Sequence, residues 1–144
     1  DEAKVTISGI LDKPGISAKI FGIMSENNIN VDMIVQNISQ DGVYANITFT
    51  INQKDHDLTK SIIEKSKNIL NYKSLLVDKK VAKVSVIGMG MMAQAGVAEK
   101  MFKTLAENSI NILAISTSEI KISVLIDEKH TNIAVKSLHE VYNL

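Results

Sequence analysis

The stretch Lys4-Val5-Thr6-Ile7-Ser8-Gly9 recurs in this chain as Lys83-Val84-Ser85-Val86-Ile87-Gly88, 79 residues later. Each copy has the β-branched composition of a strand and ends at glycine. After a loop that is two residues longer in the second copy, the match resumes at a shift of 81 residues. A match of this length and order indicates two tandem copies of one structural unit. The later matched pairs are Gly15 with Gly96, Phe21 with Phe102, Glu26 with Glu107, Asn27 with Asn108, and Ile29-Asn30-Val31 with Ile110-Asn111-Ile112.

In the first copy, the spacing of apolar residues predicts the element order βαββαβ. Pro14-Gly15 is a breaker where a helix can begin, and Asn27-Asn28 marks the end of that helix. Asp41-Gly42 is a turn pair that predicts a hairpin. The predicted strands are 5–9, 31–38, 44–51 and 74–78, and the second predicted helix covers about 56–70.

The second copy repeats this order but reaches Leu144 without a fourth strand. We therefore expect an α+β fold of two tandem ferredoxin-like βαββαβ modules with antiparallel sheets. Because an open sheet edge is a liability, a strand from outside the second copy should complete it, and a position before Asp1 in an intact protein is one candidate. The expected modules are 4–80 and 81–144, the second with a strand at 83–88, helices at 96–108 and 131–142, and a hairpin over 111–126.

The composition argues against several classes of function. Sixteen Lys plus Arg balance sixteen Asp plus Glu, so the chain lacks the basic field that gathers nucleic acid or anionic membrane surfaces. No apolar run approaches the roughly 20 residues of a membrane-spanning helix. The chain has no cysteine, which excludes disulfides and thiolate chemistry and fits a reducing compartment. We expect a soluble, cytoplasmic protein.

Few groups in the sequence could perform catalysis. His56 and His130 lie in polar helix starts and His139 lies beside Glu140, so ordinary surface positions explain all three. The stretch 88–93 matches the G-x-G-x-x-A form of a dinucleotide loop, but 111–117 offers no acid for the ribose, and the first copy lacks these glycines. We expect no catalytic residue, metal or cofactor, and a small dinucleotide oxidoreductase remains a rival interpretation.

Each strand-to-helix junction carries a loop that could bind a small anion, at 12–17 in the first copy and at 93–98 in the second. A helix N-terminus offers backbone amides to a carboxylate, and glycine lets the backbone approach closely. A free amino acid suits this arrangement. The alternative is that Pro14-Gly15 is only a turn that starts a helix.

Four stretches together resemble a known family: DKPG at 12–15, INVDMIVQN at 29–37, INILAISTSEIKISVLI at 110–126 and LHEVYNL at 138–144. They are similar to the C-terminal regulatory half of aspartate kinases inhibited by lysine and threonine, and the resemblance covers essentially the whole chain. It implies two ACT modules that form homodimers with effector sites at ACT–ACT interfaces. Nothing here resembles the kinase half, a phosphotransferase acting on the aspartate carboxyl group, so ATP and magnesium would belong to that separate domain.

The resemblance, carried over position by position, implies two effector sites. A threonine site would use Asp12, Gly15, Ile16, Ser17 and Gln36 of the first module with Asn111 and Ile112 of a facing second module. The internal repeat predicts a mirror site, where the resemblance implies lysine, with Asn30, Val31 and Asp32 of the first module and Gly96, Val97, Ala98, Ser116 and Ser118 of the second.

Some observations weigh against this assignment. Family members often carry Pro and Thr where this chain has Ala95 and Ala98, and the missing hydroxyl bears on the lysine site. Asn30 and Asn111 could instead order the start of a strand. The expected function is feedback inhibition of aspartate-family amino-acid biosynthesis through the attached kinase domain, and the rival from another class is a constitutive dimerisation scaffold that binds nothing.

Overall fold

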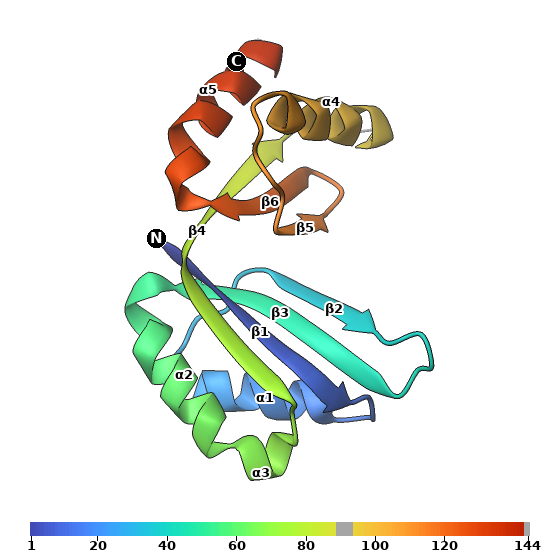
Figure 1. The fold of residues 1–144 in the computed structure, drawn as a ribbon, viewed down its shortest axis with the longest axis vertical. Helices are drawn as coiled ribbons and strands as arrows, with labels where there is room; N and C mark the ends of the chain where they lie inside the picture. Colours follow the sequence, from blue (N-terminus) through green and yellow to red (C-terminus); the bar gives the residue numbers. More distant parts are fainter. Residues whose placement is uncertain (89–93, 143–144) are drawn as a thin grey trace. The chain divides into compact units, whose positions relative to one another are not determined.

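The computed structural model describes residues 1–88 and 94–142. It divides into two compact units, Asp1–Lys79 and Lys80–Leu144, and each is described by itself (Figure 1). One long strand, β4 (Ser74–Ile87), runs from the first unit into the second.

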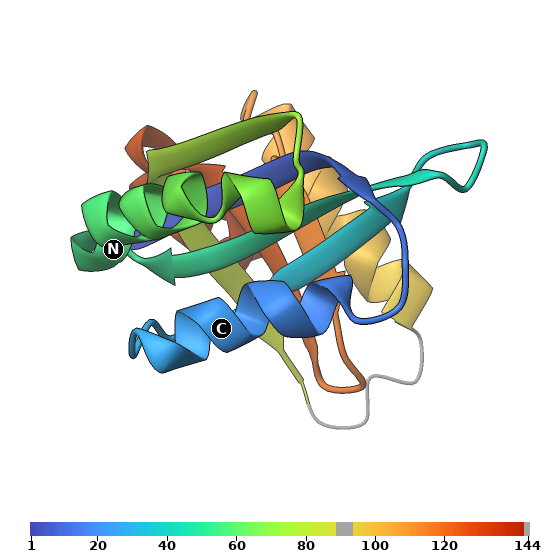
Figure 2. The ribbon, with the colours of Figure 1, turned by 90° about the horizontal axis from the view of Figure 1, so that it is seen from below.

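The first unit has the predicted βαββαβ order, with strand order β2-β3-β1-β4. Strand β3 pairs antiparallel with both β1 and β2. The helices cover one face of the sheet, and the β2–β3 hairpin loop extends beyond it (Figures 1 and 2). Besides β4, the elements are β1 (Glu2–Leu11), α1 (Ile16–Glu26), β2 (Ile34–Ile38), β3 (Tyr44–Asn52), a 3-10 turn (Gln53–Asp55), α2 (His56–Lys65) and α3 (Lys67–Leu70).

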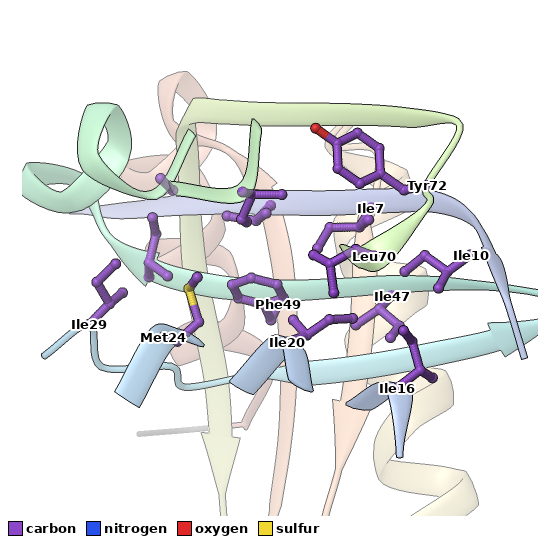
Figure 3. Close-up of a cluster of buried hydrophobic side chains, with 14 residues drawn as sticks. Ile7, Ile10, Ile16, Ile20, Met24, Ile29, Ile47, Phe49, Leu70 and Tyr72 are labelled. Atoms are coloured by element: carbon purple, nitrogen blue, oxygen red, sulfur yellow. The ribbon is translucent and has the colours of Figure 1, made fainter. Parts of the chain in front are cut away.

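The core of the first unit forms where α1 meets the inward face of the sheet. Ile16, Ile20 and Met24 recur every four residues, so they share one face of the helix, and all three are buried. They pack with Phe49 in a cluster of aliphatic side chains from β1 and β3 (Figure 3). Phe21 meets Phe49 edge to face at 5.3 Å between ring centroids. This burial fixes α1 against the sheet.

The second unit repeats the pattern with strand order β4-β6-β5 and antiparallel pairing throughout. Its core joins Met101 and Leu105 to Ala134, Leu138 and the inward residues of the sheet. Within the described part of this unit there are three strands, in agreement with the expected missing fourth strand. The elements after β4 are α4 (Gln94–Glu107), β5 (Ala114–Thr117), β6 (Lys121–Asp127), a 3-10 turn (Glu128–His130) and α5 (Thr131–Tyr142).

The ends of α1 and α4 show that the repeat extends to the backbone. Asn28 and Ser109 adopt left-handed conformations with φ of 57° and 56°. The next residue then donates its amide back to the helix, from Ile29 to Met24 O and from Ile110 to Leu105 O, both at 2.9 Å. These left-handed caps confirm the helix end predicted at Asn27-Asn28.

Several predicted boundaries differ from the structure, and three of these differences have a clear physical cause. The strands expected at 74–78 and 83–88 form one continuous strand, because Val81 is fully buried and pairs with Asp127. The helix expected over 56–70 is interrupted at Ser66, whose hydroxyl donates to the Ile62 carbonyl at 2.9 Å. Strand β2 begins at Ile34 rather than Val31, since the Met33 amide bonds to the Thr50 side chain at 3.0 Å.

Candidate functional site

The loop before α1 is held in one conformation by its backbone. The Asp12 amide donates to the Val43 carbonyl at 2.8 Å, and the Ile16 amide donates to the Lys13 carbonyl at 3.3 Å. Gly15 has φ of 91°, a backbone conformation that residues with a side chain rarely adopt. The space around it is open, because an added Cβ would meet no atom within 4 Å. Asp12 and Gly15 are exposed, Ser17 is half-buried and Ile16 is buried in the core. Helix α1 therefore begins at Ile16, shortly after the exposed Asp12 in the chain.

Strand β2 presents Gln36 on the face of the sheet that carries the helices. Gln36 pairs with Ile47, and directly paired residues of an antiparallel ladder project to the same side. Ile47 belongs to the core, yet Gln36 is exposed because β2 is the edge strand. Its neighbours on that side, Ile34 and Ile38, are 51% and 47% exposed. We call Ile34, Gln36 and Ile38 the β2 strip.

The end of β2 and the loop before α1 lie at the same end of the first sheet. Leu11 pairs with Tyr44, and Ile38 pairs with Ala45. The structure thus places the first-module residues of the predicted threonine site, Asp12 to Ser17 and Gln36, around one end of β3. Asn111 and Ile112 belong to the second unit, where Asn111 is exposed and Ile112 packs against the core.

A shallow depression of about 380 Å³ lies on the first unit. Its wall includes Asn30 and Val31, two of the three first-module residues predicted for the lysine site. Asp32 does not line it, and its amide bonds to the Thr50 carbonyl at 3.0 Å. The remaining lining residues are Phe21, Met24, Ser25, Asn28, Ile29 and Ile34.

The second unit carries a counterpart of the β2 strip on its own edge strand, β5. Ile115 pairs with the core residue Val124, and Thr117 pairs with Ile122, so both project toward the helices. Ile115 is 41% exposed. We call Ile115 and Thr117 the β5 strip. Thr117 occupies the position of Gln36 and is absent from the predicted set.

Ser116 and Ser118 do not belong to the β5 strip. Ser116 pairs with Ser123, whose hydroxyl lies 2.7 Å from that of Ser85, so this row lies on the opposite face. The Ser118 amide donates to the Lys121 carbonyl at 2.8 Å in the hairpin turn. Once the pairing register of β5 is known, strand alternation places Thr117 rather than Ser116 on the same side as Ile115.

Gly96, Val97 and Ala98 lie inside α4 rather than before it. The helix begins at Gln94, so Gly96 falls in the first turn and is not the structural equivalent of Gly15. Gly96 is exposed, while Val97 and Ala98 pack partly against the core. The prediction that this helix starts at Gly96 was therefore wrong by two residues. First-turn amides have no partner within the helix, so this segment still presents donors.

The described residues give little support to catalysis. His56 Nδ1 lies 2.8 Å from Asp57 Oδ1, a hydrogen bond that lowers the pKa of Asp57, and its Nε2 lies 3.2 Å from the Val77 carbonyl. The contact with Asp57 lies within α2, and the contact with Val77 links the start of α2 to β4. Among residues 1–88 and 94–142, no group of His, Cys, Asp and Glu could hold a metal ion.

The dinucleotide interpretation conflicts with the second sheet. A Rossmann loop joins parallel strands, whereas β4–β6 and β5–β6 are antiparallel. The candidate loop itself, 88–93, lies outside the described residues after Gly88.

As for membranes, none of the helices in the described part of the chain has the length and apolar character to cross a bilayer.

Comparison with known proteins agrees with this arrangement. A family model of the ACT domain matches residues 5–66 and 84–142. An aspartate kinase of Pseudomonas fluorescens is 47% identical over 144 residues, which cover 100% of this chain and 35% of that protein. The chain thus spans about a third of the length of the curated relatives it matches.

Two solved structures contain chains that are similar over nearly their whole length. A chain of the crystal structure of aspartokinase alpha and beta subunits has a TM-score of 0.91 and 43% identity, with 99% of this chain and 93% of that chain covered. The ligand-free regulatory subunit of aspartate kinase from Thermus thermophilus has a TM-score of 0.89 and 31% identity, with the same coverage. This chain therefore belongs to the ACT-domain family, as the tandem regulatory region of aspartate kinases.

Proposed function

We propose that this chain is an amino-acid sensor without catalytic machinery, which binds threonine and lysine between ACT modules of a homodimer and regulates a kinase domain of the same enzyme. The observation that supports it most is the exposed strip that recurs on the edge strand of each module. Each module carries one exposed strip on the helix side of its sheet, the β2 strip or the β5 strip.

The exposed isoleucines of the strips support an interface between modules. Ile34, Ile38 and Ile115 are large apolar side chains beside unpaired strand edges, and such edges tend to be covered. A second ACT module placed alongside would bury them and complete the hydrogen bonding of the edge. Ligands held at that junction would contact both modules.

The chemistry of the first module suits threonine. The amides at the start of α1 can bind the α-carboxylate, and the exposed Asp12 can neutralise the ammonium. Gln36 offers both a donor and an acceptor to the side-chain hydroxyl. In the second module Thr117 stands at the equivalent place and Ala98 lacks a hydroxyl. This difference between the modules supports two ligands of different kind, with lysine proposed for the site that includes the start of α4.

Regulation would act through the arrangement of the modules. A ligand shifts an equilibrium only by the difference in its affinity for the two states, typically about 1–3 kcal/mol of coupling. Feedback inhibition then follows if the ligand-bound arrangement disfavours the active kinase. ATP, magnesium and aspartate would bind that kinase domain, for which this chain supplies no residues.

The second candidate is a constitutive dimerisation scaffold. The apolar strips favour it as much as they favour a sensor, because both require the same interface. What separates the two is Gln36, an exposed polar residue between two exposed isoleucines. A scaffold has no use for its amide, whereas a sensor needs it for the ligand.

Calorimetric titration of the purified chain with threonine, lysine and serine tests the proposal. Gln36→Ala should weaken threonine binding about three- to tenfold, the size of one lost hydrogen bond. Asn37→Ala is the matched control, because Asn37 is the exposed neighbour that pairs with Asn46 on the opposite face. Equal threonine affinity in wild type and Gln36→Ala would remove Gln36 from the site. No saturable binding of threonine or lysine would favour the scaffold.

A further inference from the structure

The last helix of the second unit is bonded to the first turn of α4 through Tyr142. The Tyr142 hydroxyl, in the last turn of α5, donates to the Val97 carbonyl at 2.6 Å. Both residues also pack against the core of the second unit. The bond joins segments 45 residues apart in the chain, so it exists only when α4 and α5 are docked.

The environment of Tyr142 keeps its ring in place. Lys100 Nζ lies 5.2 Å from the ring centroid, on the α4 turn that follows Val97. Burial raises the pKa of Tyr142, an effect that the Met101 amide opposes through a hydrogen bond. The hydroxyl therefore stays protonated and available as a donor across the physiological pH range.

Among the described residues, the starts of α1 and α4 are held by different contacts. In the first unit the loop itself does so, through the left-handed Gly15, the bond from Ile16 to Lys13, and the buried Ile16 side chain. In the second unit Gly96 has no side chain and Val97 is only half-buried. In this described part of α4, the bond from Tyr142 ties Val97, at the end of the first turn, to another helix.

We infer that Tyr142 is a positioning residue for the second amino-acid site, because it orients the first turn of α4 through the Val97 carbonyl. The inference rests on the proposed function, in which Gly96, Val97 and Ala98 present their backbone to lysine. Tyr142 touches no ligand itself. Its effect is confined to the site that uses α4, so threonine binding beside α1 should not depend on it.

The test compares Tyr142→Phe, Lys100→Met and Tyr72→Phe with wild type in the 144-residue chain. Tyr142→Phe removes the hydroxyl alone, and Lys100→Met removes the charge above the ring. Tyr72 is the matched control in the first unit, where Lys67 Nζ lies 5.1 Å from its ring centroid. Each variant is titrated with lysine and with threonine by calorimetry, and amide hydrogen exchange is followed by NMR in α1 and α4.

We expect Tyr142→Phe to weaken lysine binding about fivefold, which is near the value of one neutral hydrogen bond. Threonine binding should stay unchanged. Amide hydrogen exchange should become faster in the first turns of α4 only. Lys100→Met should retain most of the lysine affinity, and Tyr72→Phe should retain all of it. Selective loss of lysine binding is a result that general destabilisation cannot produce.

Four other outcomes overturn the inference. Unchanged lysine binding in Tyr142→Phe, or equal weakening of lysine and threonine, removes the positioning role but leaves amino-acid sensing intact. Binding of threonine without lysine in the wild type removes the lysine site and with it this role. Binding of neither amino acid by the wild type overturns the proposed function as well.

Discussion

Replacing two glycines of the same helix region by alanine should change stability in opposite directions. Gly15 precedes α1 with φ of 91°, and Gly22 lies within α1 without a positive φ. At both positions an added Cβ would meet no atom within 4 Å. Clashes with other parts of the structure are thus absent from both substitutions, and the local backbone conformation alone decides the sign.

The expected magnitudes follow from that difference. Alanine in a left-handed conformation costs about 1–2 kcal/mol, so Gly15→Ala should lower the free energy of unfolding by roughly 1 kcal/mol after the gain from a stiffer unfolded chain. Gly22→Ala should raise it by about 0.5–1 kcal/mol, because alanine is the better helix former. For a module of this size, 1 kcal/mol corresponds to a shift in melting temperature of about 4–8 °C.

Urea unfolding followed by circular dichroism measures both variants against wild type. The slope of the unfolding free energy with urea should stay constant, since neither change alters the surface exposed on unfolding. The reasoning fails if Gly15→Ala is neutral or stabilising, because the loop before α1 would then tolerate a side chain in the left-handed region. Gly15→Asn offers a further control, as asparagine tolerates that region better and should recover part of the loss.

Two further predictions concern the core and the β2–β3 loop. Phe49→Ala should lower the free energy of unfolding, measured in urea, by about 3–5 kcal/mol, because Phe49 is fully buried among α1, β1 and β3. Leu58→Ala is the control and should lower it far less, because Leu58 is 47% exposed. Comparable losses would show that Phe49 is not central to the core. In the loop, the Ser39 hydroxyl, first among several hydrogen bonds, lowers the pKa of Asp41. Asp41 should therefore stabilise the fold above the pKa it has when unfolded, and this contribution should disappear as pH falls through the lower folded pKa. Ser39→Ala should raise the NMR-measured pKa of Asp41 toward the ordinary value of an aspartate, and an unchanged pKa would assign the effect to the backbone instead.

Much of the architecture follows from local sequence. The repeat places equivalent caps at Asn28 and Ser109, and the Asp41-Gly42 pair forms the hairpin turn, with Gly42 at φ of 76°. Helix α5 has the predicted bounds, Thr131–Tyr142. These features depend on residues within one or two turns of one another, so periodicity and turn chemistry suffice to predict them.

The candidate sites were less predictable, because strand faces depend on distant partners. Whether Ser116 or Thr117 projects toward the helices is decided by pairing with Ser123 and Ile122, and a shift of one residue would exchange the two. The serine-rich sequence carries no apolar alternation strong enough to set that register. The bond from Tyr142 to Val97 is likewise invisible in sequence, since it needs two docked helices.

By itself, the sequence determined that this protein has two tandem ferredoxin-like modules, the second without its fourth strand, where their first helices end, and which family they resemble. Tertiary structure decided that β4 is one strand and that α4 begins at Gln94. It also decided that Gln36 and Thr117, rather than Ser116, occupy the uncovered helix side of the edge strands. The reason is physical: local residues set backbone conformation, whereas only contacts between distant segments set strand register, burial and the face that a side chain presents.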